Sequence, residues 1–379
     1  MKSTLNILLT RDRSAFSTKW VCNFATNLSN AGHHVTLLCD SYENKTDAPI
    51  SPNVVKINLS KKTKNPLLNL WHRLRRFFCV PTFRFKKAIK QINPDVIICY
   101  FLRDLLNVTL WQKHDVPIIL MMHNPPDEVF AKHLKHQWQK ILFHHLMKQV
   151  AVVQVLMPEF VDLFKAEFPD MKVVVIPNQV PMPLEQKDYS QNSKTIIHVA
   201  QIAKAKRQKD LIEAFIPLAR DFPDWKIKFF GKVKNSHRHR QYREELQKLI
   251  ENNNLQNQVL FPGFSNNITQ EYLNSEIVAL PSYTEGFGYG LADGLALGLP
   301  GIGYDFAYAI NHILVDGKSG FLVKDVQDMS NKLRTLMQNA DLRHEMGKFA
   351  RHDMAKYAPE KIISSWLDLI YDVLERRNV

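Results

Sequence analysis

The sequence predicts an α/β protein in which two doubly wound parallel sheets face each other across a cleft. First, short apolar runs alternate with longer amphipathic stretches, which is typical of parallel sheets covered by helices on both faces. Second, 379 residues with 45% hydrophobic and 23% charged residues suit two domains of ordinary globular composition. Third, the alternating pattern restarts near residue 195, after a proline-rich connector.

The first set of expected strands lies within residues 1–180. The apolar runs place these strands at residues 6–10, 34–39, 54–59, 95–100, 118–122, 151–156 and 172–176. A helix is expected over residues 17–30, because Ala31 and Gly32 follow it and glycine is common just beyond a helix end.

The second set follows a connector in which Pro177, Pro181 and Pro183 disfavour a continued helix. Its strands are expected at residues 195–199, 226–230, 258–261, 277–280, 301–303 and 321–323. We therefore predict an N-terminal domain at residues 1–180 and a C-terminal domain at residues 194–355. A last helix within residues 356–379 has apolar residues at helical spacing and is expected to pack back on the first domain.

Cysteine usage and hydropathy argue against a disulfide-bonded, a secreted or a membrane-spanning protein. No two of the four cysteines form a Cys-x-x-Cys pair, so we expect free thiols in a reducing compartment. The cysteines are Cys22, Cys39, Cys79 and Cys99. The first apolar run is interrupted by charged residues at 11–13, too early for a secretory signal. No run approaches the ~20 apolar residues of a membrane span. These features predict a cytoplasmic protein.

A formal net charge of +13 is distributed unevenly along the chain. Residues 48–94 contain no acidic residue but many lysines, arginines and interleaved aromatic residues. Such a segment suits a solvated basic face, a nucleic-acid patch or a patch that rests on anionic lipid. We prefer the third interpretation, in which residues 61–90 hold the protein peripherally at the inner face of the cytoplasmic membrane, and we expect no nucleic-acid partner.

Residues 281–300 carry the most informative motif. The segment follows an apolar strand and is expected to open a helix near Tyr289. Gly286, Gly288 and Gly290 let the backbone approach a ligand closely, and the first turn of a helix offers unpaired N–H groups to an anion. The motif therefore predicts a site for a phosphate-bearing ligand.

The spacing Glu285-x7-Asp293 resembles the Glu-x7-Glu motif of the retaining glycosyltransferases of family 4, which have the GT-B fold of two Rossmann-like domains. Weaker similarities to family segments occur in the same order at residues 30–38, 93–98, 175–178 and 313–323. The resemblance implies that Glu285 contacts the donor sugar and that Asp293, one methylene shorter than the family residue, holds the ribose. It also implies donor binding by the intervening Gly286, Phe287, Gly288, Tyr289 and Gly290.

Residues 198–212 are similar to the family loop in which an arginine and a lysine clamp the donor diphosphate. Lys206 falls on the lysine position, so the resemblance implies that it binds phosphate. Gln201 stands at the arginine position, where Lys204 or Arg207 would have to substitute. Lys232, just beyond the expected strand 226–230, is a further expected phosphate contact.

His123 follows the expected strand 118–122 and should point into the cleft. A lone histidine is more often structural than catalytic, but the resemblance implies that His123 contacts the donor sugar or the acceptor near the reacting centre. The family's Gly-Gly turn after the first strand is replaced by residues 11–16, which suggests an anion-binding loop built from side chains.

The sequence contains no Asp-x-Asp and no His/Cys cluster with metal-ligand spacing, so we expect no metal and no other cofactor. The expected activity is transfer of a hexose or N-acetylhexosamine from a nucleotide sugar, with a UDP-sugar preferred, to a saccharide acceptor. Retention of configuration, a lipid-linked acceptor and a role in bacterial lipopolysaccharide, capsule or related glycan assembly are implied by the resemblance. The alternatives are a catalytically degenerate protein that binds a partner glycosyltransferase, and a glycan phosphorylase or nucleotide-sugar epimerase.

Overall fold

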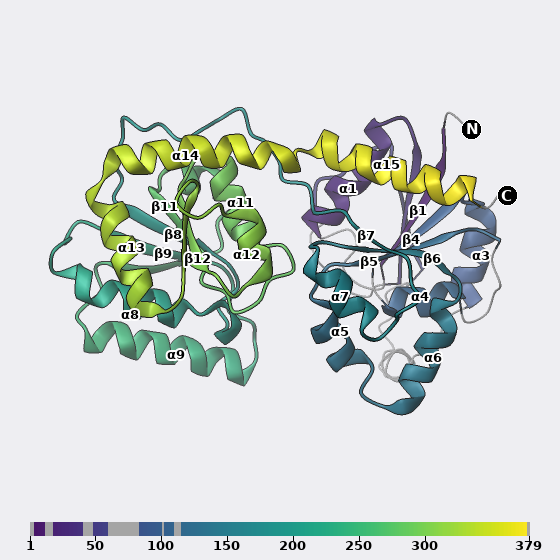
Figure 1. Cartoon of the computed structure of the whole chain (residues 1–379), viewed down its shortest axis with the longest axis horizontal. Coiled ribbons are helices and arrows are strands. Elements are labelled where there is room, and N and C mark those ends of the chain that lie inside the picture. The colour runs from purple at the N-terminus through teal and green to yellow at the C-terminus, as the bar shows by residue number, and fades with distance from the viewer. Residues whose placement is uncertain are drawn as a thin grey trace, which may run out of the picture. The chain divides into compact units, whose positions relative to one another are not determined.

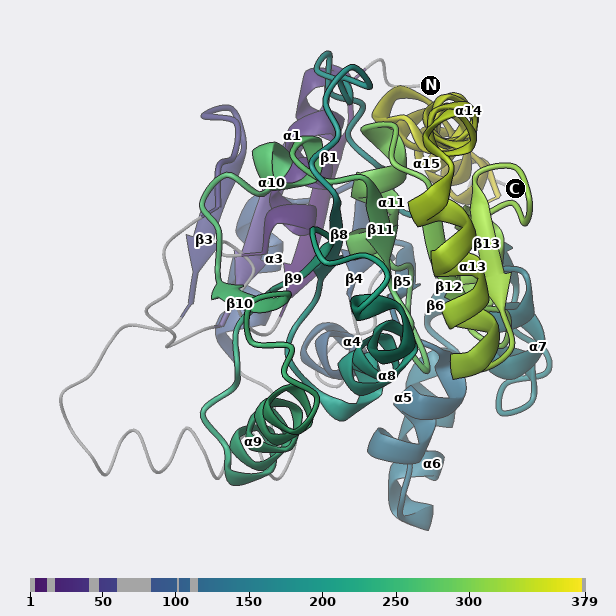
Figure 2. The same ribbon diagram turned by 90° about the vertical axis from the view of Figure 1, so that its left-hand side faces the viewer.

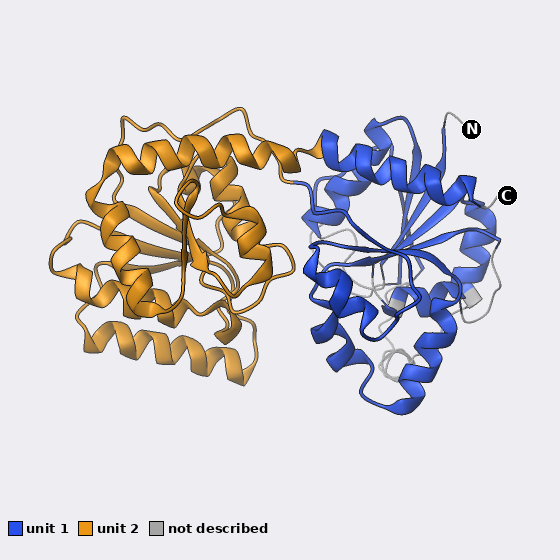
Figure 3. Ribbon diagram, viewed as in Figure 1, with its two compact units in different colours: residues 1–179, 360–379 blue, residues 180–359 orange. Residues whose placement is uncertain are grey.

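The computed structural model describes residues 4–11, 18–40, 48–59, 83–100, 102–109 and 115–376. The chain divides into two compact units (Figure 3), which we describe separately. Unit 1 comprises residues 1–179 and 360–379, and unit 2 comprises residues 180–359. The family resemblance implies acceptor binding by the N-terminal domain and donor binding by the C-terminal domain, and both roles stay predictions.

Unit 1 contains a seven-stranded sheet in the order β3-β2-β1-β4-β5-β6-β7, with every pair of neighbours parallel. The strands are β1 (Asn6–Arg11), β2 (His34–Cys39), β3 (Val55–Asn58), β4 (Val96–Cys99), β5 (Ile118–Met122), β6 (Val150–Val155) and β7 (Val173–Val175). In Figure 1, α1 (Lys19–Asn30) and α15 (Pro359–Glu375) cover one face of this sheet. Its described helices also include α3 (Phe83–Ile92), α4 (Leu102–Thr109), α5 (Pro126–His133), α6 (Gln137–Met147) and α7 (Glu159–Lys165).

Helix α15 packs on unit 1 through its apolar stripe. Trp366 and Ile370 are fully buried, and the Trp366 ring lies 5.1 Å from the Phe24 ring of α1. Lys172 Nζ lies 2.7 Å from Asp372 Oδ2 and ties the same helix to the residue that precedes β7. The stripe is therefore core packing, as its spacing predicts.

Unit 2 contains a six-stranded parallel sheet in the order β10-β9-β8-β11-β12-β13. The strands are β8 (Thr195–Val199), β9 (Lys226–Phe230), β10 (Val259–Gly263), β11 (Ile277–Ala279), β12 (Gly301–Tyr304) and β13 (Gly320–Val323). Its helices are η1 (Lys204–Lys206), α8 (Gln208–Ala219), α9 (His237–Asn252), α10 (Ile268–Leu273), α11 (Tyr289–Ala296), α12 (Tyr308–Ile313), α13 (Val326–Gln338), α14 (Ala340–Met354) and η2 (Ala355–Tyr357).

The core of unit 2 lies between the sheet and the helices on its two faces. In Figures 1 and 2, α8, α9 and α13 cover one face of the sheet and α11 and α12 the other. Phe215 of α8, Leu246 of α9 and Leu333 of α13 are completely buried against strand residues such as Ile196 and Ile227. The α/β fold with two parallel sheets is confirmed, and each expected strand is present with ends within two residues of those predicted.

The connector expected between the domains forms neither helix nor strand over residues 177–193. From Val180 onward it belongs to unit 2, because the guanidinium of Arg351 on α14 donates hydrogen bonds to the carbonyls of Pro183 and Glu185. Among the helices that the structure describes, none is long and apolar enough to cross a membrane. Most of the basic segment 61–90, including residues 61–82, lies outside the described residues, as does Cys79.

Candidate functional site

The carboxylate of Glu285 and the ammonium of Lys206 form an ion pair at the end of the unit 2 sheet where the strands terminate. Lys206 Nζ lies 2.6 Å from Glu285 Oε1, and Ser282 donates a hydrogen bond to the same oxygen at 2.7 Å. The side chain of Lys206 is 24% exposed and that of Glu285 is 14% exposed, so solvent reaches the ion pair although most of its surface is covered. Both hydrogen bonds that the carboxylate accepts from described residues go to Oε1.

The loop that carries Lys206 is held by backbone contacts. Residues 204–206 form one turn of 3₁₀-helix, and the following Arg207 adopts the left-handed conformation with φ of 49° before α8 begins. The N–H of Tyr283 donates to the carbonyl of Ala205 at 2.9 Å and joins this loop to the one that carries Glu285. Two segments 79 residues apart are thereby held together.

A buried polar network lies behind the same loop. His198 on β8 is completely buried, and its Nδ1 lies 2.9 Å from the carbonyl oxygen of Ala279. Because a carbonyl only accepts, Nδ1 is the protonated nitrogen, and Nε2 accepts from the side-chain amide of Gln208 at 3.1 Å. The same amide donates to the carbonyl of Gln201 at 3.0 Å, which fixes the start of the loop. His198 and Gln208 were not predicted as site residues from the sequence, whereas Gln201 was.

This network makes the stability of unit 2 depend on pH. Burial, with a smaller effect of the Lys206 charge, lowers the pKa of His198 to about 4. Between pH 6.5 and 4 the unfolded chain therefore binds a proton that the folded unit does not, so stability is lost as the pH falls through this window. We expect the wild type to lose about 2 kcal/mol between pH 7 and 5 from this residue alone.

Urea unfolding of the wild type and of His198→Gln at pH 7 and pH 5 measures this effect. The variant should lose less stability than the wild type, since an amide keeps a hydrogen bond but does not titrate in this range. The matched control is His352→Gln, which changes an exposed histidine on α14. This variant should lose as much stability between pH 7 and pH 5 as the wild type. An equal loss in wild type and His198→Gln would contradict the assignment.

Helix α11 starts where the Glu285 loop ends, and glycines bring it close to β8. Gly288 precedes the helix with φ of +89°, a conformation that favours glycine. A Cβ added to Gly290 would lie 2.0 Å from the carbonyl oxygen of Val199, the last residue of β8. Only a hydrogen at this position lets the first turn of α11 pack against the strand end beside the Lys206 loop.

The other predicted residues of the motif have different environments. Asp293 is half-buried in the second turn of α11, and its charge adds to burial in raising the pKa of Tyr272. Phe287 is only 3% exposed, and its ring packs edge-on against Tyr357 at 5.4 Å. Any ligand contact of Phe287 in this conformation is therefore through its backbone. Gly286 and Tyr289 are half-buried beside it.

The cations considered as substitutes at the Gln201 position have other partners. Arg207 lies 3.0 Å from Asp210 and its guanidinium packs over the Tyr304 and Phe306 rings. Lys204 pairs with Glu245 of α9 at 3.7 Å. Lys232 is exposed beyond the end of β9, and its ammonium lies 4.4 Å from the centre of the Phe264 ring. Lys206 is therefore the lysine that contacts Glu285 directly.

His123 belongs to unit 1 and follows β5 directly. Its ring packs against Trp20 at 4.3 Å and is stacked on Tyr100 at 5.5 Å. Burial, with the nearby charge of Arg11, lowers the pKa of His123 to about 3, so the ring is neutral at pH 7. Its Nε2 is shielded from solvent and has no hydrogen-bond partner among the described residues. His123 thus carries a nitrogen that a hydroxyl-bearing ligand would satisfy.

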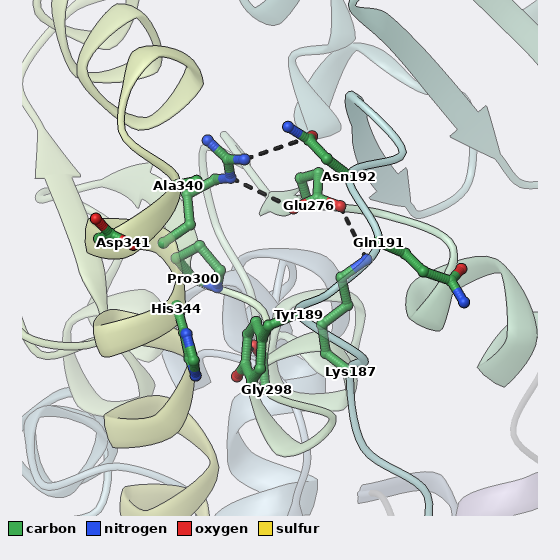
Figure 4. A pocket seen from close by; sticks show the side chains of 11 residues that line it. Lys187, Tyr189, Gln191, Asn192, Glu276, Gly298, Pro300, Ala340, Asp341 and His344 are labelled. Carbon is green, nitrogen blue, oxygen red and sulfur yellow. Dashed lines mark hydrogen bonds and ion pairs between the residues drawn. The ribbon is translucent and has the colours of Figure 1, made fainter.

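A separate pocket lies at the amino ends of the central strands of unit 2, since Glu276 directly precedes β11 and Pro300 directly precedes β12 (Figure 4). Inside it, the buried Glu276 pairs with Lys187 at 2.9 Å and with Arg343 at 3.4 Å. Arg343 also reaches Asn192 at 3.4 Å. These contacts bind the connector to α14 and β11, so the cluster has a structural role. Among the residues described by the structure, no group of histidines, cysteines and carboxylates is arranged to hold a metal.

Solved structures share this fold. The chain superposes on sucrose-phosphate synthase of Thermosynechococcus elongatus with a TM-score of 0.79 and 16% identity, covering 99% of this chain and 100% of that one. HepE of Anabaena, solved with UDP and glucose, gives a TM-score of 0.72 at 16% identity over 97% and 99% of the two chains. The fold is that of a GT-B glycosyltransferase.

The family models identify the chain more closely. Residues 18–182 match the model described as Glycosyltransferase Family 4, and residues 184–353 match that of Glycosyl transferases group 1. The two models together take in most of the chain, and both describe glycosyltransferases, the class to which the chain belongs. The poly(ribitol-phosphate) alpha-N-acetylglucosaminyltransferase of Staphylococcus aureus is 24% identical over 61% of this chain and 46% of that protein. The matches to the first curated relatives span between 21% and 58% of their lengths.

Proposed function

We propose that this protein is a retaining, metal-independent glycosyltransferase that moves a hexose or N-acetylhexosamine from a UDP-sugar to a saccharide acceptor. The observation that carries the proposal is the Glu285 carboxylate, held 2.6 Å from Lys206 Nζ beside the start of α11. A nucleotide sugar has a diphosphate that needs positive charge and a sugar whose anomeric carbon becomes positive in the transition state. In this proposal Lys206 supplies the positive charge for the diphosphate, and Glu285 supplies the negative charge for the anomeric carbon.

In this proposal the donor diphosphate takes Lys206 and the N–H groups at the start of α11 as its partners. The helix start contributes a partial positive charge. Together with lysines it neutralises the phosphate charge, which in other enzymes is neutralised by a divalent ion. Gln201, Lys232 and the backbone of residues 286–290 line the donor, Asp293 holds the ribose, and Glu285 faces the sugar. The resemblance further supports a role for His123, whose neutral ring would accept a hydrogen bond from a hydroxyl of the donor sugar or the acceptor.

The acceptor and setting are part of the proposal. The Staphylococcus relative is named for adding a sugar to a phosphate-containing polymer, and the Anabaena structure holds UDP and glucose. These names support a nucleotide-sugar donor and a saccharide acceptor in bacterial surface-glycan assembly. A lipid-linked acceptor would be met at the inner face of the cytoplasmic membrane, where the basic segment 61–90 rests on anionic lipid.

The test is a panel of UDP- and GDP-sugars, scored by calorimetric binding and by slow hydrolysis without acceptor, in the presence and absence of EDTA. We expect one UDP-sugar to bind saturably and to be hydrolysed at the same rate with EDTA, with the product sugar released initially as the α-anomer when the donor is an α-linked sugar nucleotide. Binding without hydrolysis or transfer would favour a degenerate binding protein. Failure of every donor to bind folded protein would overturn the proposal.

A further inference from the structure

A second basic segment begins where β9 ends. No acidic residue occurs from residue 225 to residue 243, whereas the chain beyond the strand carries a dense basic run. We call this run the α9 basic segment, and it consists of Lys232, Lys234, His237, Arg238, His239 and Arg240. The net charge of +13 therefore has a source in unit 2, besides the basic residues of the first domain.

The charges of this segment are exposed and uncompensated. Five of its six basic side chains belong to exposed residues, and His239 is half-buried. Within the described part of the chain, none of them forms an ion pair; Arg240, for example, donates to the neutral side chain of Asn235 at 2.6 Å. Lysines elsewhere in unit 2 behave differently, since Lys194 pairs with Asp224 at 2.8 Å and Lys209 with Glu245 at 3.3 Å.

The segment also places positive charge where a helix disfavours it. Residues 237–240 form the first turn of α9, and this turn contains no acidic residue. The N-terminus of a helix carries partial positive charge, so cations there are unfavourable for helix stability, most of all at low ionic strength. The first turns of α8, α13 and α14 hold Asp210, Asp328 and Asp341 instead. An arrangement that is unfavourable for stability indicates a binding role.

The segment is continuous with the proposed donor site. The N–H of Ile202 donates to the carbonyl of Lys232 at 3.2 Å, and Ile202 forms a parallel bridge with Val233. Ile202 directly follows Gln201 in the Lys206 loop. Strands β8 and β9 are parallel neighbours, and their carboxyl ends lie side by side, with Val199 opposite Phe230. A ligand that begins near Lys206 can therefore continue onto the basic segment.

We infer that the α9 basic segment binds an anionic glycan, namely the part of a phosphate- or carboxylate-bearing acceptor chain that lies beyond the residue receiving the sugar. The inference rests on the proposed function. Lipid is the less suitable occupant, because a surface-bound helix needs an exposed apolar face. The apolar residues of α9, Tyr242, Leu246 and Ile250, are buried in the core of unit 2.

The experiment compares two triple variants of the full chain. Lys234→Gln/Arg238→Gln/Arg240→Gln removes three charges from the segment and leaves every residue assigned to the donor in place. Arg220→Gln/Lys226→Gln/Lys348→Gln removes three charges from other exposed positions of unit 2 and is the matched control. Binding to a phosphomannan, to polygalacturonate, to neutral dextran and to phosphatidylglycerol vesicles is measured at 50 and 300 mM NaCl, beside donor hydrolysis without acceptor.

We expect the wild type to bind at least one anionic glycan, at least tenfold more weakly at the higher salt concentration, and not to bind dextran. The segment variant should bind that glycan at least tenfold more weakly than the control variant, with donor hydrolysis unchanged. Equal glycan binding by the two variants would overturn the inference, as would failure of both anionic glycans to bind. A loss confined to vesicle binding would assign the segment to lipid instead. Absence of donor hydrolysis in all proteins would contradict the proposed function alone.

Discussion

Glu285→Gln is expected to reduce donor hydrolysis and sugar transfer at least 100-fold while leaving UDP binding intact or slightly tighter. In the wild type, the Glu285 carboxylate lies 2.6 Å from Lys206 Nζ and competes with the donor diphosphate for that ammonium. The amide keeps the size of the side chain and removes its charge. Lys206 is then free to pair with phosphate, whereas the positive charge that develops on the sugar loses its counter-charge.

Calorimetry with UDP and a hydrolysis assay with the donor identified by the panel separate these two effects. Glu345→Gln, which neutralises an exposed carboxylate on α14, is the control and should behave as the wild type in both assays. A rate for Glu285→Gln above one tenth of the wild-type rate would refute the role of Glu285. A parallel loss of UDP binding and turnover would mean that the carboxylate holds the loop rather than acting on the sugar.

The strands of both units could be predicted because a buried parallel strand needs a continuous apolar run. Residues 118–122 and 277–280 meet this requirement, and β5 and β11 occupy these positions. Strand ends are less well defined: β10 continues to Gly263, beyond the predicted residue 261, since its pairing with β9 shifts register after Leu260. Such irregularities depend on the neighbouring strand and leave no local pattern.

The candidate site could be predicted only in part. The resemblance to two family motifs indicated Glu285 and Lys206 separately, but their ion pair joins residues that are far apart in the sequence. The network of His198 and Gln208 was missed because a histidine within a run of aliphatic residues has no pattern that distinguishes a buried hydrogen-bond donor. The neutral state of His123 likewise follows from burial against Trp20 and Tyr100, which only the folded chain brings together.

Gly290→Ala is expected to destabilise unit 2 by about 3 kcal/mol or more and to abolish donor binding. The added methyl carbon would lie 2.0 Å from the carbonyl oxygen of Val199, well inside van der Waals contact. That oxygen belongs to the backbone of β8, so no side chain can rotate away to make room. Either the first turn of α11 moves or the end of β8 does, and both carry the proposed donor site.

Gly317→Ala is the matched control because it also replaces a glycine by alanine in unit 2. Gly317 has φ of +70° but nothing within 4 Å of the added carbon, so only backbone strain of about 1 kcal/mol is expected and donor binding should persist. Chemical denaturation measures the two stabilities, and calorimetry with UDP measures binding. If Gly290→Ala is no less stable than Gly317→Ala and still binds UDP, the close packing of α11 on β8 does not position the donor. If it folds with reduced stability and has lost UDP binding, the helix start must lie where the structure places it for the site to work.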